Sequence, residues 1–86
     1  MELEQLRVFL AVAEHRSFSA AARALFVSHS TTSRAVAALE RELGAALLLR
    51  EGRTVRLTRE GEIMQAEAKR VLEQVEELKA AIKRGE

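Results

Sequence analysis

The sequence contains no cysteine, proline, tryptophan or tyrosine, and it has only three phenylalanines. The absence of cysteine excludes disulfides and thiolate zinc sites. The two histidines have no neighbours at ligand spacing, so we expect no metal site and no cofactor. The opening residues, MELEQL, carry acids where a signal peptide needs basic residues, and no apolar run approaches the ~20 residues that cross a membrane. We therefore expect a cytoplasmic protein without membrane contact.

The chain also lacks the residue combinations of an enzyme. No carboxylate pair, nucleophile–base set or phosphate-binding loop stands out, so we predict no catalytic residues. The 86 residues fit one small domain, near the size at which a partner subunit adds needed stability. Dimerisation is consistent with this length.

The net charge of +1 hides an uneven distribution along the chain. Residues 1–49 hold five arginines and five glutamates, which balance each other. Residues 50–59 hold four arginines against one glutamate, whereas residues 60–77 hold six glutamates against one lysine and one arginine. A basic window of this kind is typical of a surface that binds nucleic acid, although chance clustering of surface charges would look the same.

A first helix is predicted over residues 2–15. Its apolar residues recur at helical spacing and form a broad stripe, which indicates a structural helix that packs against more than one neighbour. They are Leu3, Leu6, Phe9, Leu10 and Ala13, widened by Val8 and Val12.

A short second helix and a tight turn should follow. Ser17 is a suitable N-cap, and the alanines within residues 20–24 allow two helices to cross closely. This pattern predicts a helix-turn-helix over about residues 18–37. We expect Leu25 and Val27 to be buried beside the turn and Phe26 to pack locally, with contact to a partner as the alternative for Phe26.

The third helix is predicted to begin after an N-cap at Ser28 and to end at Gly44. One face carries Thr32, Val36, Leu39 and Leu43, spaced by four, three and four, and should face the core. The other face of its first turns is small and polar, which suits close approach to bases and phosphates in a DNA major groove. These residues are His29, Ser30, Thr31, Ser33 and Arg34. Arg34 is suited to a two-bond contact with guanine; a turn that only caps itself in solvent is the alternative.

A two-stranded wing is predicted over about residues 47–58. Strands at 47–50 and 55–58 should flank a turn at 51–54. Arg53 at the tip suits a phosphate or a narrow minor groove, and Arg23, Arg50 and Arg56 are further candidates for the DNA backbone. An ordinary solvated hairpin is the alternative.

The last part of the chain is predicted to be one long helix with Thr58 as its N-cap. Its apolar residues repeat every 3.5 residues on average, which is typical of a helix that pairs with another helix. They are Met64, Ala68, Val71, Val75, Leu78 and Ile82. A helix of about 26 residues is ~39 Å long, too long to be covered by so small a domain. We therefore expect a homodimer formed through this helix, with a fraying tail as the alternative for its last turns.

The order and spacing of these motifs resemble the N-terminal winged helix-turn-helix domain of LysR-type transcriptional regulators. The matching segments lie within about residues 3–61 and are SFSAAA, VSHSTTSR, LERELG, LLLREGR and LTREG. The resemblance implies a recognition helix in the major groove, a wing at phosphates or the minor groove, and linker helices that pair antiparallel in a dimer. A molybdate-regulator-type winged helix is a closely related alternative.

Three positions depart from the pattern of that family. His29 stands where glutamine is usual, Thr32 where a bulky aliphatic residue is usual, and Leu48 where phenylalanine is common. An imidazole offers one donor or acceptor where an amide offers both, so His29 bears on base preference. Thr32 needs a partner for its hydroxyl, for which we predict a backbone carbonyl one turn earlier.

Together these patterns predict a mostly α fold. Residues 1–58 should form a winged helix-turn-helix of three helices and a two-stranded wing, and residues 59–86 a linker and dimerisation helix. The expected function is sequence-specific binding of double-stranded DNA as a dimer, with regulation of transcription. A module that recruits a protein partner through the heptad helix is the alternative. We expect no effector domain and no small-molecule effector site within this chain.

Overall fold

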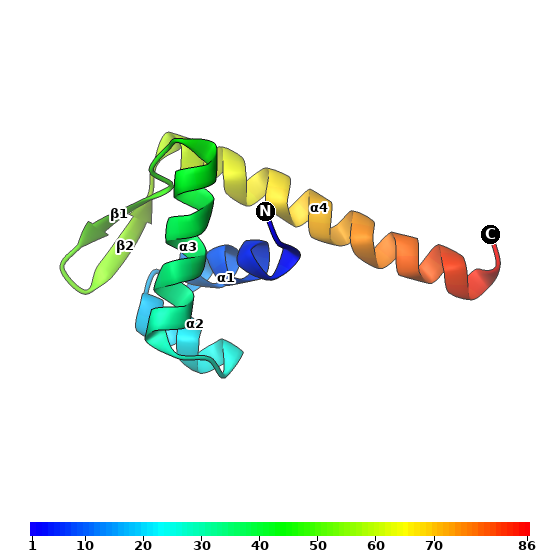
Figure 1. The fold of residues 1–86 in the computed structure, drawn as a ribbon, viewed down its shortest axis with the longest axis horizontal. Helices are drawn as coiled ribbons and strands as arrows, with labels where there is room; N and C mark the ends of the chain where they lie inside the picture. Colours follow the sequence, from blue (N-terminus) through cyan, green and yellow to red (C-terminus); the bar gives the residue numbers. More distant parts are fainter.

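The computed structural model describes residues 1–86 as four helices and a two-stranded hairpin. In chain order these are α1 (Leu3–His15), α2 (Phe18–Leu25), α3 (His29–Leu43), β1 (Leu48–Glu51), β2 (Thr54–Leu57) and α4 (Arg59–Arg84). The first three helices pack together, the antiparallel hairpin projects as a wing, and the second half of α4 extends away from the rest (Figure 1). The predicted mostly α winged helix-turn-helix is confirmed. None of the helices combines the length and apolar character needed to span a membrane.

Local capping sets most of the helix boundaries. The Ser17 hydroxyl accepts from the Ala20 amide at 3.0 Å, and the Ser28 hydroxyl accepts from the Thr31 amide at 3.0 Å. Thr58 accepts in the same way from the Gly61 amide at 2.9 Å. Gly44 ends α3 in a left-handed conformation with φ of 67°, which glycine adopts without strain. These four capping predictions are therefore confirmed.

The core lies where α1 meets the other elements. α1 packs against α2, α3, α4 and β2, so its predicted contact with several neighbours is confirmed. Apolar residues from every helix and both strands form one cluster: Leu6, Val8, Phe9, Val12, Phe18, Ala21, Val36, Leu39, Leu47, Leu48, Val55 and Ala68. Thr32 is also fully buried, and its hydroxyl donates to the Ser28 carbonyl at 3.0 Å, as predicted.

The structure corrects the prediction for Phe26. Its side chain is 94% exposed, so it does not pack locally. Phe26 is the C-cap of α2, and its left-handed backbone, with φ of 58°, lets its amide bond back to the carbonyls of Ala22 and Arg23. The chain reverses at this residue, and the side chain is left in solvent. Leu25 and Val27 on either side are only half-buried.

The ends of the apolar rows and the strands also differ from the prediction. Leu43 is 45% exposed, because α3 ends there and the chain turns away at Gly44. Leu3 is likewise exposed, one residue after the N-cap of α1. The strands are Leu48–Glu51 and Thr54–Leu57, since the Leu47 amide bonds to a side chain of α3 and Thr58 caps α4.

Glu40 joins the third helix to the wing. One of its carboxylate oxygens accepts from the backbone amides of Leu47 at 2.8 Å and Leu48 at 3.3 Å. Its backbone carbonyl accepts from the Gly44 amide at 2.8 Å. Hydrogen bonds to a charged carboxylate are stronger than neutral ones, so this residue fixes how the wing leaves α3.

Candidate nucleic-acid interface

The first turn of α3 presents a linked set of hydroxyl groups. Ser28 donates to the Thr31 hydroxyl at 2.8 Å and lies 3.2 Å from the Ser30 hydroxyl. The turn therefore caps itself in part, as the alternative interpretation held. Ser30 and Arg34 are nevertheless exposed, and Thr31 and Ser33 are half-buried, so the predicted DNA face stays accessible.

A stack of three side chains connects this turn to the wing. The Arg50 guanidinium lies over the Phe18 ring at 4.1 Å from its centroid. The Phe18 ring in turn lies 5.9 Å from the His29 ring, tilted by 42°. Phe18 thus lies beside both an arginine of β1 and the first residue of α3. Sequence reasoning did not find this role of Phe18, because nothing local shows that residue 50 folds back beside residue 18.

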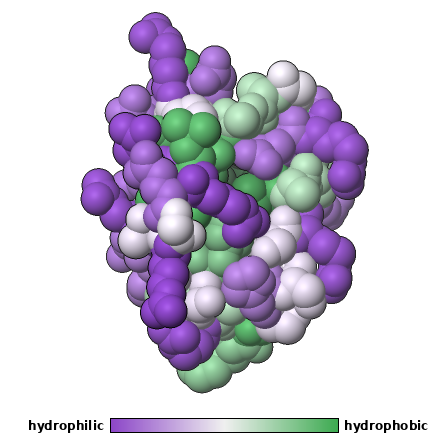
Figure 2. Space-filling view, turned by 90° about the vertical axis from the view of Figure 1, so that its left-hand side faces the viewer, coloured by the Kyte–Doolittle hydropathy of each residue, from purple (hydrophilic) through white to green (hydrophobic).

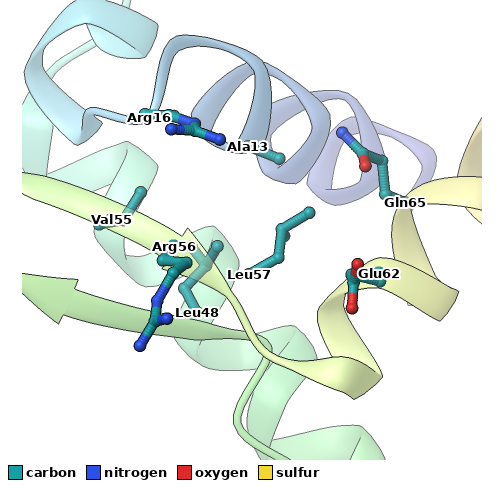
Figure 3. Close-up of a pocket in the computed structure, with 8 residues that line it drawn as sticks. All are labelled: Ala13, Arg16, Leu48, Val55, Arg56, Leu57, Glu62 and Gln65. Carbon is teal, nitrogen blue, oxygen red and sulfur yellow. The ribbon is translucent and has the colours of Figure 1, made fainter.

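The two faces of the wing carry different arginines. Arg50 pairs with Val55 across the ladder, and Leu49 pairs with Arg56. Paired residues share a face and successive residues alternate, so Arg50 and Arg56 lie on opposite faces. Figure 3 shows Leu57 directed into the hollow between α1 and α4, while Arg56 points away from it. The structure therefore brings Arg50, but not Arg56, toward α2 and α3.

The arginines fall into a paired and an unpaired group. Those with a glutamate oxygen within 4.0 Å are Arg7, Arg56, Arg70 and Arg84. The other arginines have no glutamate oxygen within this distance. They include the predicted DNA contacts Arg23, Arg34, Arg50 and Arg53, together with Arg16, Arg41 and Arg59. Arg56 is the exception among the predicted contacts, because Glu51 lies 3.0 Å from its guanidinium. Unpaired arginines are the ones most free to bind an anion.

A cleft of about 460 Å³ opens between the start of α2, His29 and the wing. Its lining consists of Ser17, Phe18, Ser19, His29, Arg50, Gly52, Arg53, Thr54 and Val55. Two arginines and no carboxylate line it, and the first amides of α2 have no partner within their helix. Figure 2 views the molecule from the wing side, where hydrophilic side chains cover much of the surface. Such a cleft suits an anion such as a phosphate.

The structure divides the predicted dimerisation seam into a covered part and a free part. Ala68 is buried in the core of this chain, and Met64 packs against that core. Farther along α4, Val71 is 43% exposed, Leu78 59% and Ile82 69%, while Val75 is half-buried. The seam that is open to a partner helix therefore begins at Val71. The structure contains no group of three or more acidic, histidine or cysteine side chains that would hold a metal ion.

Comparison with known proteins identifies the family of the N-terminal region. A family model described as bacterial regulatory helix-turn-helix protein, lysR family, matches residues 3–62. The chain is 44% identical over 82 residues to the HTH-type transcriptional regulator IlvY of Escherichia coli (strain K12), a match that covers 95% of the chain and 28% of that protein. It is 43% identical over 84 residues to a probable cat1 operon transcriptional activator of Acinetobacter lwoffii, covering 98% of the chain and 28% of that protein. The chain thus spans 28% of the length of these relatives.

Two solved structures have the same fold over nearly the whole chain. One is a CbnR_DBD–DNA complex, with a TM-score of 0.96 and 38% identity over 99% of this chain and 98% of that one. The other is a complex of BenM_DBD with benA site 1 DNA, with a TM-score of 0.94 and 40% identity over 100% of both chains. These two similar proteins were solved bound to DNA.

Proposed function

Because the chain belongs to the lysR family of bacterial regulatory helix-turn-helix proteins, we propose that it binds duplex DNA sequence-specifically as a dimer and regulates transcription. Residues 1–58 are the DNA-binding domain, and residues 59–86 are the linker and dimerisation helix. The observation that carries the proposal is the carboxylate-free cleft, which joins the polar turn of α3 to the unpaired arginines of the wing. This role requires no catalytic group, and it places the protein in the cytoplasm with the DNA.

Each part of this surface has a distinct role in the proposal. The first turns of α3 enter the major groove, where His29, Ser30, Thr31, Ser33 and Arg34 contact bases or position the helix. Arg50 and Arg53 bind the backbone from the wing, Arg53 also reaching for the minor groove, and Arg23 binds it from α2. Arg56 is a weaker backbone candidate, because Glu51 already neutralises it.

Arg34→Ala should weaken specific binding by about 1–3 kcal/mol per protomer, because a two-bond contact to guanine is lost. The same variant should accept more than one base at the position that Arg34 reads. Selection of bound sequences from random duplex DNA, followed by titration of the selected duplex, measures both effects. A variant with unchanged affinity and unchanged base preference would show that Arg34 does not contact the bases.

Arg53→Ala should mainly change the salt dependence of binding, because it removes a contact to phosphate. The slope of log K against log salt concentration should become shallower by about 1 per protomer. Arg7→Ala is the matched control, since it removes the same charge from an exposed position of α1 that has no role in the proposed DNA surface and already pairs with Glu4. Its slope should equal that of the wild type. Equal slopes for the wild type and Arg53→Ala would contradict the assignment of Arg53.

The dimer in this proposal rests on the free apolar row of α4 and on its charge distribution. Residues 60–77 carry six glutamates against two basic residues, whereas residues 78–86 carry three basic residues against one glutamate. Hydrogen bonds to Glu86 and then to Glu77 raise the pKa of Arg84 and hold its guanidinium against its own helix. Antiparallel pairing places the acidic part of each helix beside the basic end of the other, and parallel pairing does not.

An apolar groove at the other end of α4 fits the same arrangement. It is formed by Leu43, Ala45, Leu47, Ile63 and Met64, with Glu60 and Glu67 at its edge. An antiparallel overlap centred midway between residues 64 and 82 brings residue 82 of one helix beside this groove of the other. The two DNA-binding domains then address half-sites roughly one DNA turn, ~34 Å, or a multiple apart.

A protein-recruiting module is the second candidate, and the exposed Phe26 and α4 row are the observations that favour it. Binding to random-sequence duplex DNA at several salt concentrations separates the two functions. A DNA-binding protein loses affinity linearly on a log–log plot as counterions are released. A chain that shows no such binding would be the protein-recruiting module instead.

A further inference from the structure

His29 lies at the junction of the recognition helix and the wing, and its ring is held from two sides. It is the exposed first residue of α3. Phe18 packs beside the ring, and Nδ1 lies 3.4 Å from the Ser33 hydroxyl oxygen. No group of the chain hydrogen-bonds to Nε2. Nε2 is therefore the ring nitrogen that is free to contact a ligand.

The contact with Ser33 positions the ring without choosing what Nε2 offers. A hydroxyl accepts from Nδ1–H as well as it donates to an unprotonated Nδ1, so the neutral ring can present either a donor or an acceptor at Nε2. Protonation removes this ambiguity. The imidazolium donates to Ser33 through Nδ1–H, and Nε2–H is then only a donor.

The charged groups around His29 change their effect when DNA binds. The wing contributes Arg50 and Arg53 to the cleft that His29 lines, and Arg34 is the nearest charged residue in sequence along α3. The residues at the start of α2 in this cleft are the N-cap Ser17, Phe18 and Ser19, and all three are uncharged. Bound phosphates offset the charge of these arginines and add a negative potential, which favours a proton on a neighbouring imidazole.

We infer that His29 selects guanine in the bound DNA by donating from Nε2–H of a protonated ring, with Phe18 and Ser33 as positioning residues. Guanine presents two acceptors, N7 and O6, and no donor at its major-groove edge. Adenine presents one acceptor beside an amino donor, thymine one acceptor beside a methyl group, and cytosine an amino donor, so guanine is the base that best suits a group that can only donate. Binding is therefore coupled to the uptake of a proton from solvent. The preference for guanine at this position therefore sharpens as the pH falls. The inference rests on the proposed DNA binding.

Parallel selections from random duplex DNA at about pH 6 and about pH 8 test it, because histidine is the side chain that ordinarily titrates between these values. The wild type is compared with His29→Gln and with His15→Gln, which removes the only other histidine, an exposed residue at the end of α1. We expect the wild type and His15→Gln to enrich guanine at one position of each half-site more strongly at the lower pH. Their affinity for the selected duplex should be about fivefold or more lower at the higher pH than at the lower pH. His29→Gln should lose both effects.

A proton NMR titration of the two histidine rings, with and without the selected duplex, gives an independent readout. The His29 resonances should titrate at a higher pH in the complex than in the free chain, and the His15 resonances should not move. Equal pH dependence of the wild type and His29→Gln, or equal enrichment of guanine by both, would overturn the inference and leave the DNA-binding function intact. A wild type that enriches no sequence and binds no random duplex would overturn both.

Discussion

Replacing Gly61 by alanine is expected to destabilise the folded chain by about 3 kcal/mol, although alanine is the better helix former. Gly61 is buried in the first turn of α4, and a Cβ atom there would overlap the backbone carbonyl of Leu47. That carbonyl already accepts from the Thr58 amide at 3.0 Å, so it has little freedom to move. This overlap can be relieved only if α4 shifts away from Leu47. The shift also weakens the hydrogen bond of 2.7 Å from the Thr58 hydroxyl to the Ala46 carbonyl.

Thermal or urea unfolding at one fixed protein concentration measures this effect, because the stability of a dimer depends on concentration. For a chain of this size the melting temperature should fall by about 12 °C or more. Gly44→Ala is the matched control: a Cβ atom there meets nothing within 4 Å, and only its left-handed backbone opposes the change. It should cost about 1 kcal/mol. A Gly61→Ala variant that melts at or above the wild-type temperature would show that α4 does not dock against Leu47 in this way.

Val75→Glu is expected to convert the proposed dimer to monomers and to lower the affinity for a two-half-site duplex by about 100-fold or more. Val75 lies in the free part of the seam, between Val71 and Leu78. In an antiparallel pair each of the two subunits then brings one unpaired carboxylate into an apolar contact. Burying these charges raises the free energy of the dimer. The residue makes no contribution to the core of its own chain, so the monomer should stay folded.

Sedimentation of the variant tests the loss of the dimer, and circular dichroism checks that the helices persist. Ala66→Glu adds the same charge nine residues earlier, on the opposite side of α4 and at an exposed position. It should leave the mass and the DNA affinity close to those of the wild type. A Val75→Glu chain that sediments with unchanged mass would rule out the seam as the dimer contact.

The proposed DNA-binding surface was predictable from sequence only in its separate parts. Small polar residues after the N-cap at Ser28 mark the exposed turn of α3, and the arginine-rich window marks the wing. Their union in one cleft was not predictable, since it depends on how Glu40 holds the start of β1. The same limit applies to Arg50 and Arg56, which look equivalent in the sequence. The strand register places them on opposite faces, and Glu51 pairs with only one of them.

The sequence by itself determined where α2, α3 and α4 begin and where α3 ends, because Ser17, Ser28, Thr58 and Gly44 act on backbone groups within a few residues of themselves. It also determined the family, through motifs in a fixed order. Only the tertiary structure decided which apolar residues are free for a partner, since Ala68 and Val71 belong to the same repeat and differ only in what packs on them. It alone brought Phe18 beside both His29 and Arg50 and set Gly61 against Leu47. These contacts join residues far apart in the chain, and no local pattern encodes them.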